Sequence, residues 1–174
     1  MSHTVKDLIA GHDANAPAIG APGRDWLTYG ALRALSGSVA VSLHAAGVGR
    51  GDRVAIVLPN GPEMAAAFVT VAQAAVTAPL NTAYRLHEVA FYLELMGAKA
   101  ILLMAGDDGP AAQAASKLGL SIIRVNVDES QPAGAFTLSS QTEGRGDPST
   151  PEDGDEALIL HTSGTTSLPK IVPL

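Results

Sequence analysis

The sequence of 174 residues contains no cysteine and few aromatic residues. Without cysteine the chain can form no disulfide bond, no thiolate metal site and no cysteine nucleophile. This absence fits an intracellular protein, and we expect a cytoplasmic location. Aromatic residues make up 4% of the sequence and hydrophobic residues 47%, with alanine and valine supplying much of that share. We therefore expect one folded domain whose core is built from small, closely packed side chains.

Basic residues are also scarce, with 11 Lys and Arg against 17 Asp and Glu, which gives a net charge of −6. These basic residues are scattered, whereas nucleic-acid binding needs clusters that neutralise phosphates, so we expect no nucleic-acid partner. None of the five histidines stands at metal-ligand spacing from another. We expect no metal site in this chain, and most histidines to be solvated or singly hydrogen-bonded.

Long uninterrupted apolar runs are missing as well. The longest apolar stretch, residues 64–80, is broken by Thr70, Gln73, Thr77 and Pro79. A membrane-spanning helix needs roughly 20 predominantly apolar residues, so we expect no membrane span. The first ten residues, MSHTVKDLIA, lack the apolar core of a secretory signal.

The hydrophobic residues that are present predict an alternation of helices and strands. Thr28 is placed to cap a helix that ends at Gly47, and a shorter helix is expected within residues 4–12. The apolar stripe of the longer helix consists of Leu32, Leu35, Val39 and Leu43. Continuous apolar, β-rich segments predict buried strands at residues 53–58, 76–80, 99–104 and 121–125. Helices are expected between these strands, at residues 62–75, 86–96 and 107–119. This order predicts an α/β fold with a mainly parallel sheet and crossover helices.

Residues 126–155 have a different composition, rich in Gly, Pro, Ser, Thr and acids, with no apolar period. We interpret them as a solvated surface loop, including the five acidic residues between Asp147 and Glu156. The short apolar segment at residues 157–160 is expected to be one more strand that returns to the same sheet.

The segment HTSGTTSLPK, residues 161–170, carries the most concentrated polar chemistry. Gly164 lets the backbone turn closely around a ligand, Lys170 adds a positive charge, and consecutive backbone N–H groups can bind an anion. The hydroxyl groups come from Thr162, Ser163, Thr165, Thr166 and Ser167. This inventory suits phosphate, although an ordinary loop is the commoner meaning of such a composition. It is not a Walker A loop, because Gly164 stands alone and Ile171 follows Lys170.

The pattern TSGTT-x-x-PK resembles the phosphate loop of the adenylate-forming superfamily, which includes acyl- and aryl-CoA synthetases, luciferases and peptide-synthetase adenylation domains. Three further segments resemble the family's N-terminal region in the right order: Leu27-Thr28-Tyr29, GVGRGDRVAIVLPNGPE and APLNTAYRLHEVAFYLE. The resemblance covers about residues 27–174 and is nearest to the oxalate–CoA ligase and 4-coumarate–CoA-ligase-like branch. It implies the first lobe of the family's N-terminal domain.

The resemblance also implies roles for individual residues. Thr162, Ser163, Gly164, Thr165, Thr166, Ser167 and Lys170 would wrap the β- and γ-phosphates of ATP. A carboxylic acid substrate would attack the α-phosphorus to give an acyl-adenylate, and the thiol of CoA would then displace AMP. ATP, CoA and Mg²⁺ are thus implied, with the Mg²⁺ ligand expected outside this chain. Ser167 and Ile171 stand where many members have glycine. Asn81, Tyr84 and Arg85 match the family too, and we expect them to form a turn and dock a helix without a catalytic part.

Members of this family are far longer than 174 residues. We therefore expect residues 1–174 to be a partial N-terminal AMP-binding domain, truncated after the phosphate loop, with no catalytic residue of its own. Alone it is expected not to catalyse adenylation, because the remaining parts of the site are absent. The helix expected at residues 62–75 is apolar nearly all round, so we expect either exposed apolar surface that is hidden by self-association, or a compact first lobe that folds alone. Two alternatives stay open: an adenylation domain that loads a carrier protein, and a non-catalytic interaction lobe with a purely structural loop.

Overall fold

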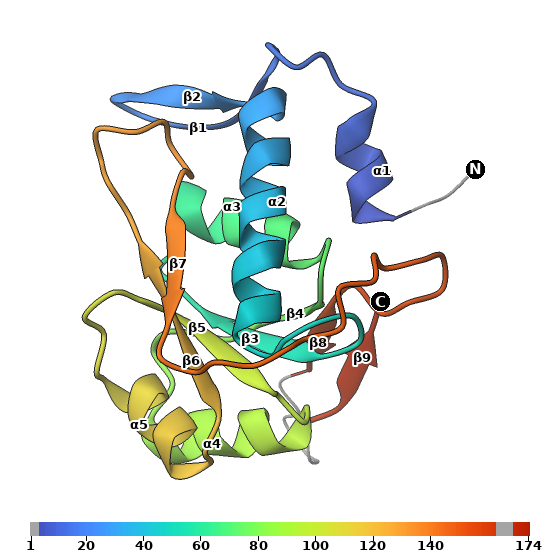
Figure 1. Cartoon of the computed structure of the whole chain (residues 1–174). Coiled ribbons are helices and arrows are strands. Elements are labelled where there is room, and N and C mark those ends of the chain that lie inside the picture. The colour runs from blue at the N-terminus through green and yellow to red at the C-terminus, as the bar shows by residue number, and fades with distance from the viewer. Residues whose placement is uncertain (1–3, 163–168) are drawn as a thin grey trace.

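A five-stranded sheet in the order β4-β3-β5-β6-β7 forms the centre of the fold in the computed structural model, which describes residues 4–162 and 169–174 (Figure 1). Four of its strands pair in parallel and match the four predicted segments: β3 (Arg53–Val57), β4 (Val76–Pro79), β5 (Ala100–Met104) and β6 (Ser121–Asn126). The predicted α/β fold with a mainly parallel sheet is confirmed.

Helices cover both faces of this sheet (Figure 1). Successive side chains of a strand point to opposite faces, so Val54 and Ile56 pack against α2 (Tyr29–Ala45) and α3 (Pro62–Val71). Ala55 and Val57 face the other way and pack against α4 (Leu86–Leu95) and α5 (Pro110–Lys117). The short helix α1 (Val5–Ala10) contacts α2. Because both faces are covered, the strands are buried on both sides and read as continuous apolar runs.

The ends of α2 follow the sequence prediction. The Thr28 hydroxyl accepts a hydrogen bond of 3.2 Å from the backbone N–H of Ala31, which satisfies one of the unpaired donors of the first turn. Gly47 terminates the helix at a φ of 83°, a conformation that costs glycine little. Helix α3 is shorter than predicted, because it ends at Val71 and residues 72–75 form a turn.

Four strands were not predicted: β9 (Ile171–Pro173), close to the end of the sequence, and three others. A hairpin of β1 (Pro17–Ala21) and β2 (Arg24–Thr28) precedes α2, and β7 (Thr137–Ser140) pairs antiparallel with β6. The interpretation of residues 126–155 as loop is therefore wrong at β7. Its side chains are mostly exposed, so pairing with the edge of β6, and not an apolar pattern, makes this segment a strand.

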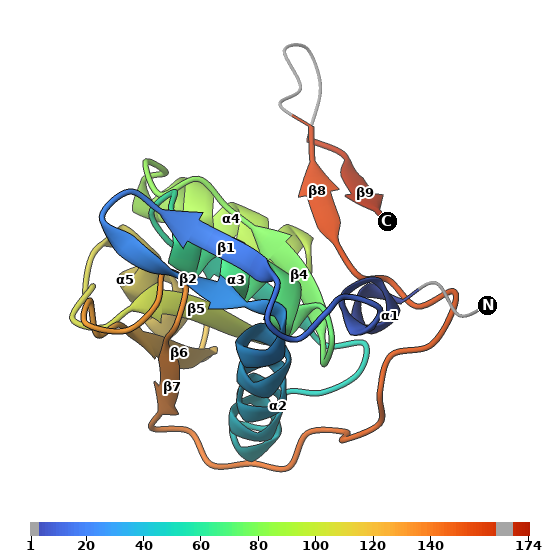
Figure 2. The ribbon, with the colours of Figure 1, turned by 90° about the horizontal axis from the view of Figure 1, so that it is seen from above.

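The strand β8 (Ile159–His161) exists where a strand was expected, but it pairs with β9 (Ile171–Pro173) and does not extend the sheet. Among the described residues a single parallel bridge, between Thr77 and Leu158, joins this segment to β4. Figure 2 shows the β8–β9 hairpin projecting from the body of the fold.

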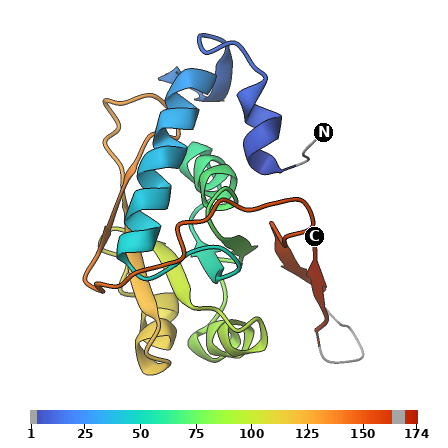
Figure 3. The ribbon, with the colours of Figure 1, turned by 45° about the vertical axis from the view of Figure 1, so that its right-hand side comes forward.

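Residues 141–156, which we name the strap, run from β7 past the C-terminal end of α2 to β8 (Figure 3). The guanidinium of Arg50 forms ion pairs with Asp155 at 2.7 Å and with Glu152 at 3.1 Å, and Arg53 pairs with Glu156 at 3.0 Å. The acidic run is therefore anchored to the start of β3 and is not simply solvated. Within the described part of the chain, no helix is both long and apolar enough to cross a membrane.

Candidate phosphate-binding site

The hairpin brings the two ends of the predicted phosphate loop together. The backbone N–H of Thr162 donates a 3.0 Å hydrogen bond to the carbonyl of Lys170, and the N–H of Lys170 donates to the Thr162 hydroxyl at 3.3 Å. The other predicted site residues, Ser163, Gly164, Thr165, Thr166 and Ser167, lie outside the described residues. Thr162 and Lys170 thus form the described base of the candidate site.

Both residues retain chemistry that suits an anion. A hydroxyl has one proton and two acceptor positions, so the Thr162 hydroxyl that accepts from Lys170 still has its proton to donate. Lys170 is exposed, and the ion pairs found in the described part of the chain do not include it. A phosphate group at the end of the hairpin would meet one hydroxyl donor and one cation.

Hydrogen bonds to the edge of the large sheet fix the base of the hairpin. The Thr77 backbone N–H and hydroxyl both donate to the carbonyl of Ala157, at 3.0 and 2.9 Å. Ala157 and Leu158 in turn donate to the carbonyl of Leu174, at 2.8 and 3.1 Å. Ile159 is buried in the cluster beneath α4, so the hairpin begins in the core and only its far end reaches the candidate site.

A cluster of three rings, Tyr84, Tyr92 and His161, joins the hairpin to α4. The Tyr84 hydroxyl shares a 3.0 Å hydrogen bond with Nε2 of His161. The Tyr84 ring stacks on Tyr92 with centroids 5.1 Å apart, and Tyr92 lies 4.2 Å from the His161 ring. Burial lowers the pKa of His161, and burial raises the pKa of Tyr84, with a smaller contribution from Tyr92.

Sequence reasoning missed this cluster as part of the site. It expected His161, like most of the histidines, to be solvated or singly hydrogen-bonded, and Tyr84 to help form a turn and dock a helix. In the structure His161 is half-buried and bonds to Tyr84, and Tyr84 lies in a turn in which its N–H donates to the carbonyl of Asn81 at 3.2 Å. The one feature of the sequence that could have pointed to His161 as part of the site is its position directly before Thr162. The turn role of Asn81 and Arg85 is also confirmed: the Asn81 side chain accepts from the N–H of Ala83 at 2.9 Å, and the N–H of Arg85 donates to Glu88 at 2.8 Å.

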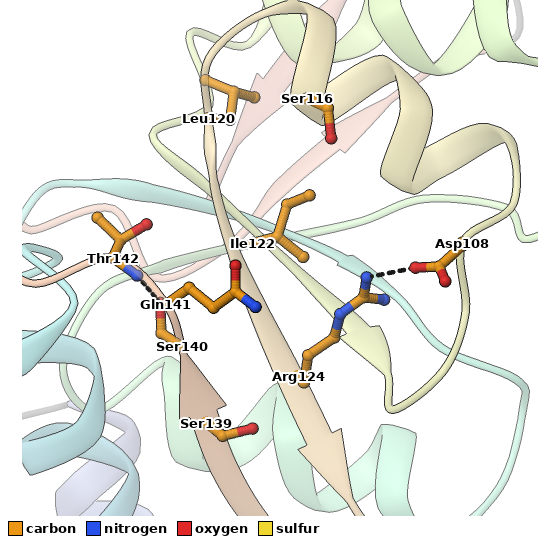
Figure 4. A pocket seen from close by; sticks show the side chains of 9 residues that line it. All are labelled: Asp108, Ser116, Leu120, Ile122, Arg124, Ser139, Ser140, Gln141 and Thr142. Carbon is orange, nitrogen blue, oxygen red and sulfur yellow. Dashed lines mark hydrogen bonds and ion pairs between the residues drawn. The ribbon is translucent and has the colours of Figure 1, made fainter.

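A separate cavity of about 540 Å³ lies between α5, β6 and β7 (Figure 4). The cation that lines it, Arg124, is already engaged: the guanidinium donates to Asp108 at 2.8 Å and to the backbone carbonyls of Asp107 and Met104. Neither Thr162 nor Lys170 lines this cavity. We therefore exclude it from the candidate phosphate-binding site.

The residues described around the hairpin supply no carboxylate set for a metal. Magnesium prefers carboxylate and phosphate oxygens, and the described part of the chain contains no group of three or more His, Cys, Asp or Glu residues placed to hold a metal ion. The donors at the site are a hydroxyl and an ammonium group, which suit the phosphates of a nucleotide more than the metal itself.

The fold and the hairpin together are those of an adenylate-forming enzyme. The model of the family "AMP-binding enzyme" matches residues 7–174, and the chain belongs to this family. The sequence is 39% identical over 166 residues to an oxalate–CoA ligase of Arabidopsis thaliana and 37% identical over 166 residues to a probable CoA ligase, CCL9, of Humulus lupulus. Each alignment covers 90% of this chain but 31% of the relative.

Solved structures agree with these sequence matches. The chain is similar to apo MatB from Rhodopseudomonas palustris, with a TM-score of 0.76 and 28% identity over 98% of this chain and 34% of that protein. It is equally similar to ATP-bound MatB, with a TM-score of 0.76 and 27% identity over 100% of this chain and 35% of that protein. The chain thus spans about a third of the length of the relatives that it matches.

Proposed function

We propose that the chain is the N-terminal part of an ATP-dependent carboxylate–CoA ligase, in which residues 162–170 bind the β- and γ-phosphates of ATP. The observation that carries this proposal is the pairing of Thr162 with Lys170 at the far end of the hairpin, which brings together the two ends of TSGTT-x-x-PK. Support also comes from the relatives that are named CoA ligases and from the similarity to the ATP-bound structure of MatB.

The role of this chain in the proposed reaction is to hold a leaving group. The carboxylate of the acid attacks the α-phosphorus, the bond between the α-phosphorus and the bridging oxygen breaks, and pyrophosphate departs. CoA then displaces AMP through its thiol to give the acyl-CoA. Donors already aimed at the outgoing phosphates stabilise the charge that develops on them. Lys170 contributes a positive charge, and Thr162 contributes a hydroxyl proton.

The magnitude of this stabilisation follows from the type of bond. Hydrogen bonds to charged groups contribute about 1.5–3 kcal/mol each. The resemblance assigns further donors to Ser163, Thr165, Thr166 and Ser167, and Gly164 lets the backbone approach the phosphates. Mg²⁺ would neutralise phosphate charge when bound. No carboxylate set fits it among the residues described, so the proposal leaves its protein ligand outside this chain.

Replacing Lys170 tests the proposal. In the full-length ligase, Lys170→Ala is expected to raise the KM for ATP by about tenfold or more, because one charge-assisted phosphate contact is lost. ATP–pyrophosphate exchange, measured with a panel of short and aromatic acids, gives this KM and also identifies the acid. Lys117→Ala is a matched control, since Lys117 is an exposed lysine at the end of α5.

An unchanged KM for ATP in Lys170→Ala would contradict phosphate binding and favour a purely structural loop. The same assay on residues 1–174 alone is expected to show no exchange. Product analysis with CoA and with a pantetheine-bearing carrier protein as competing acceptors distinguishes a CoA ligase from a carrier-loading domain. The proposal also includes a cytoplasmic location, consistent with the absence of cysteine.

The proposal further includes self-association of residues 1–174 when they are expressed alone. The observation that supports it is apolar surface on the hairpin, where Leu160 is 42% and Val172 is 37% exposed.

A further inference from the structure

The candidate site lies at the end of the β8–β9 hairpin, which makes few described contacts with the rest of the fold. A two-stranded hairpin is marginally stable in water unless it packs on something else. Hydrogen bonds at Thr77 attach the base of the hairpin to the sheet. At the far end, next to Thr162, the described contacts are those of the ring cluster Tyr84, Tyr92 and His161.

We propose that Tyr84 and His161 are positioning residues for the phosphate-binding site, with Tyr92 as the surface on which both rings rest. This inference rests on the proposed function. Tyr84 lies two residues before α4, and its hydroxyl bonds to His161, which is 77 residues further along the chain. The bond therefore ties the end of the hairpin to the segment that leads into α4 of the main fold.

The register of the β8–β9 pair explains why fixing the position of His161 also fixes the positions of Thr162 and Lys170. His161 pairs with Ile171 as the last pair of the β8–β9 ladder. Thr162 follows His161 and Lys170 precedes Ile171, so each site residue is one peptide unit from this pair. Ile171 also packs against the cluster that contains Tyr84 and Tyr92. A rotation of the hairpin about its base would move both Thr162 and Lys170 relative to the main fold.

The surroundings of this hydrogen bond favour uncharged partners. Burial lowers the pKa of His161 and raises that of Tyr84, which favours the uncharged imidazole and the protonated phenol. A neutral imidazole and a neutral phenol hold a geometry without adding charge to the site.

Tyr84→Phe removes only the hydroxyl and leaves the ring on Tyr92. In the full-length ligase we expect the KM for ATP to rise about three- to tenfold, the size of effect expected from one neutral hydrogen bond. The KM for the carboxylic acid is expected to stay unchanged, because the proposed function assigns the loop to the phosphates of ATP and not to the acid. A general loss of packing would change both constants, so this split identifies positioning.

Matched variants separate positioning from simple loss of a side chain. Tyr29→Phe is the control, because Tyr29 also stacks on a histidine, His12 at 4.1 Å, but at the start of α2. It is expected to leave both KM values unchanged. His161→Ala is expected to match Tyr84→Phe, and His161→Gln, whose amide can bond to the Tyr84 hydroxyl, is expected to recover at least part of the loss.

A spectroscopic measurement on residues 1–174 tests the bond without any catalysis. The ¹⁵N shifts of the His161 ring report its tautomer and hydrogen bond, and Tyr84→Phe is expected to change them while Tyr29→Phe does not. If Lys170→Ala raises the KM for ATP but Tyr84→Phe does not, positioning is overturned and the proposed function stands. If neither variant affects the KM for ATP, the proposed function fails and this inference fails with it.

Discussion

The five-stranded sheet and the β8–β9 hairpin are built from similar residues but differ greatly in burial. In β3, residues 54–57 are at most 3% exposed, and in β5 residues 100–103 are fully buried. In the hairpin, Leu160 is 42% exposed and Val172 is 37% exposed. Apolar side chains alone therefore do not determine how much a strand contributes to stability, because the contribution depends on what covers them.

The sheet and the hairpin also differ in what they contribute: the buried sheet provides most of the stability, and the hairpin carries the candidate site. The sheet is covered by helices on both faces. Among the described residues, the hairpin is held by the bridge and hydrogen bonds at Thr77, by the buried Ile159 and by the ring cluster next to α4. Regions with few buried contacts open locally at lower cost than the core. Under the proposed function the hairpin admits and releases a triphosphate, and a segment with that role is expected to be among these less stable regions. The candidate site accordingly stands on the hairpin, and its positioning depends on a few specific contacts.

The largest expected difference in the free energy of unfolding comes from truncating one leucine in the sheet and one in the hairpin. Leu102 in β5 is fully buried beneath α2 and α3, and Leu102→Ala is expected to lower the free energy of unfolding by about 2–5 kcal/mol. Leu160→Ala, in the hairpin, is expected to lower it by less than about 1 kcal/mol. Urea unfolding of both variants measures the difference, and similar losses would show that the hairpin is part of the cooperative core.

The same contrast explains what the sequence could predict. β3 and β5 were predictable because strands covered on both faces are continuous apolar runs. β7, with the sequence TLSS, was not predictable. It is a mostly exposed edge strand without an apolar pattern, and it is extended because it pairs with β6. The pairing partner of β8 was also missed, since a short apolar segment such as ALIL does not encode which strand it will meet.

The candidate site shows a similar limit. The motif identified residues 162–170 because hydroxyls, glycine and lysine are concentrated within one short segment. The ring cluster could not be read from local composition, because Tyr84 and His161 are 77 residues apart and meet only through the fold. Contacts between residues that are far apart in the sequence, and that belong to no motif, cannot be recognised from local sequence patterns.

The strap offers an intermediate case between the sheet and the hairpin. Gly146 donates its N–H to the carbonyl of His44 at 2.9 Å, and a Cβ at Gly146 would overlap the backbone of Val48. Gly146→Ala is therefore expected to cost about 1–3 kcal/mol through backbone displacement. Thermal or urea unfolding measures the loss.

Gly37 provides the matched control for this glycine. It lies within α2, and a Cβ there would meet nothing within 4 Å. Gly37→Ala is expected to raise stability by about 0.5–1 kcal/mol through its better helix propensity. Opposite signs for the two Gly→Ala variants are the expected result, whereas a neutral Gly146→Ala would show that the strap can detach without cost to the core.

The smallest expected effect is a pH dependence of the strap alone. The guanidinium of Arg50 holds the pKa of Asp155 below its ordinary value of 3.8. A carboxylate with a lowered pKa stabilises the folded form above its unfolded pKa, and this contribution is lost as the pH falls through the folded value. Asp147, whose pKa is lowered by Ser149, titrates in the same direction. We therefore expect the strap to loosen below about pH 4 while the parallel sheet stays protected.

Amide hydrogen exchange between pH 5 and pH 3 measures this loosening, with the N–H groups of Gly146 and Arg50 reporting on the strap. Asp155→Asn is expected to remove most of the change in amide exchange of the strap between pH 5 and pH 3. The smaller change that remains is expected to come from Asp147. Asp128→Asn is the matched control, because the pKa of Asp128 is also lowered, chiefly by Ser130 and not by an ion pair with the strap. Equal protection of the strap at both pH values in the unaltered chain would mean that backbone contacts such as that of Gly146 hold it without help from Arg50. The strap would then belong with the sheet, and the hairpin would be the one weakly held region of the comparison.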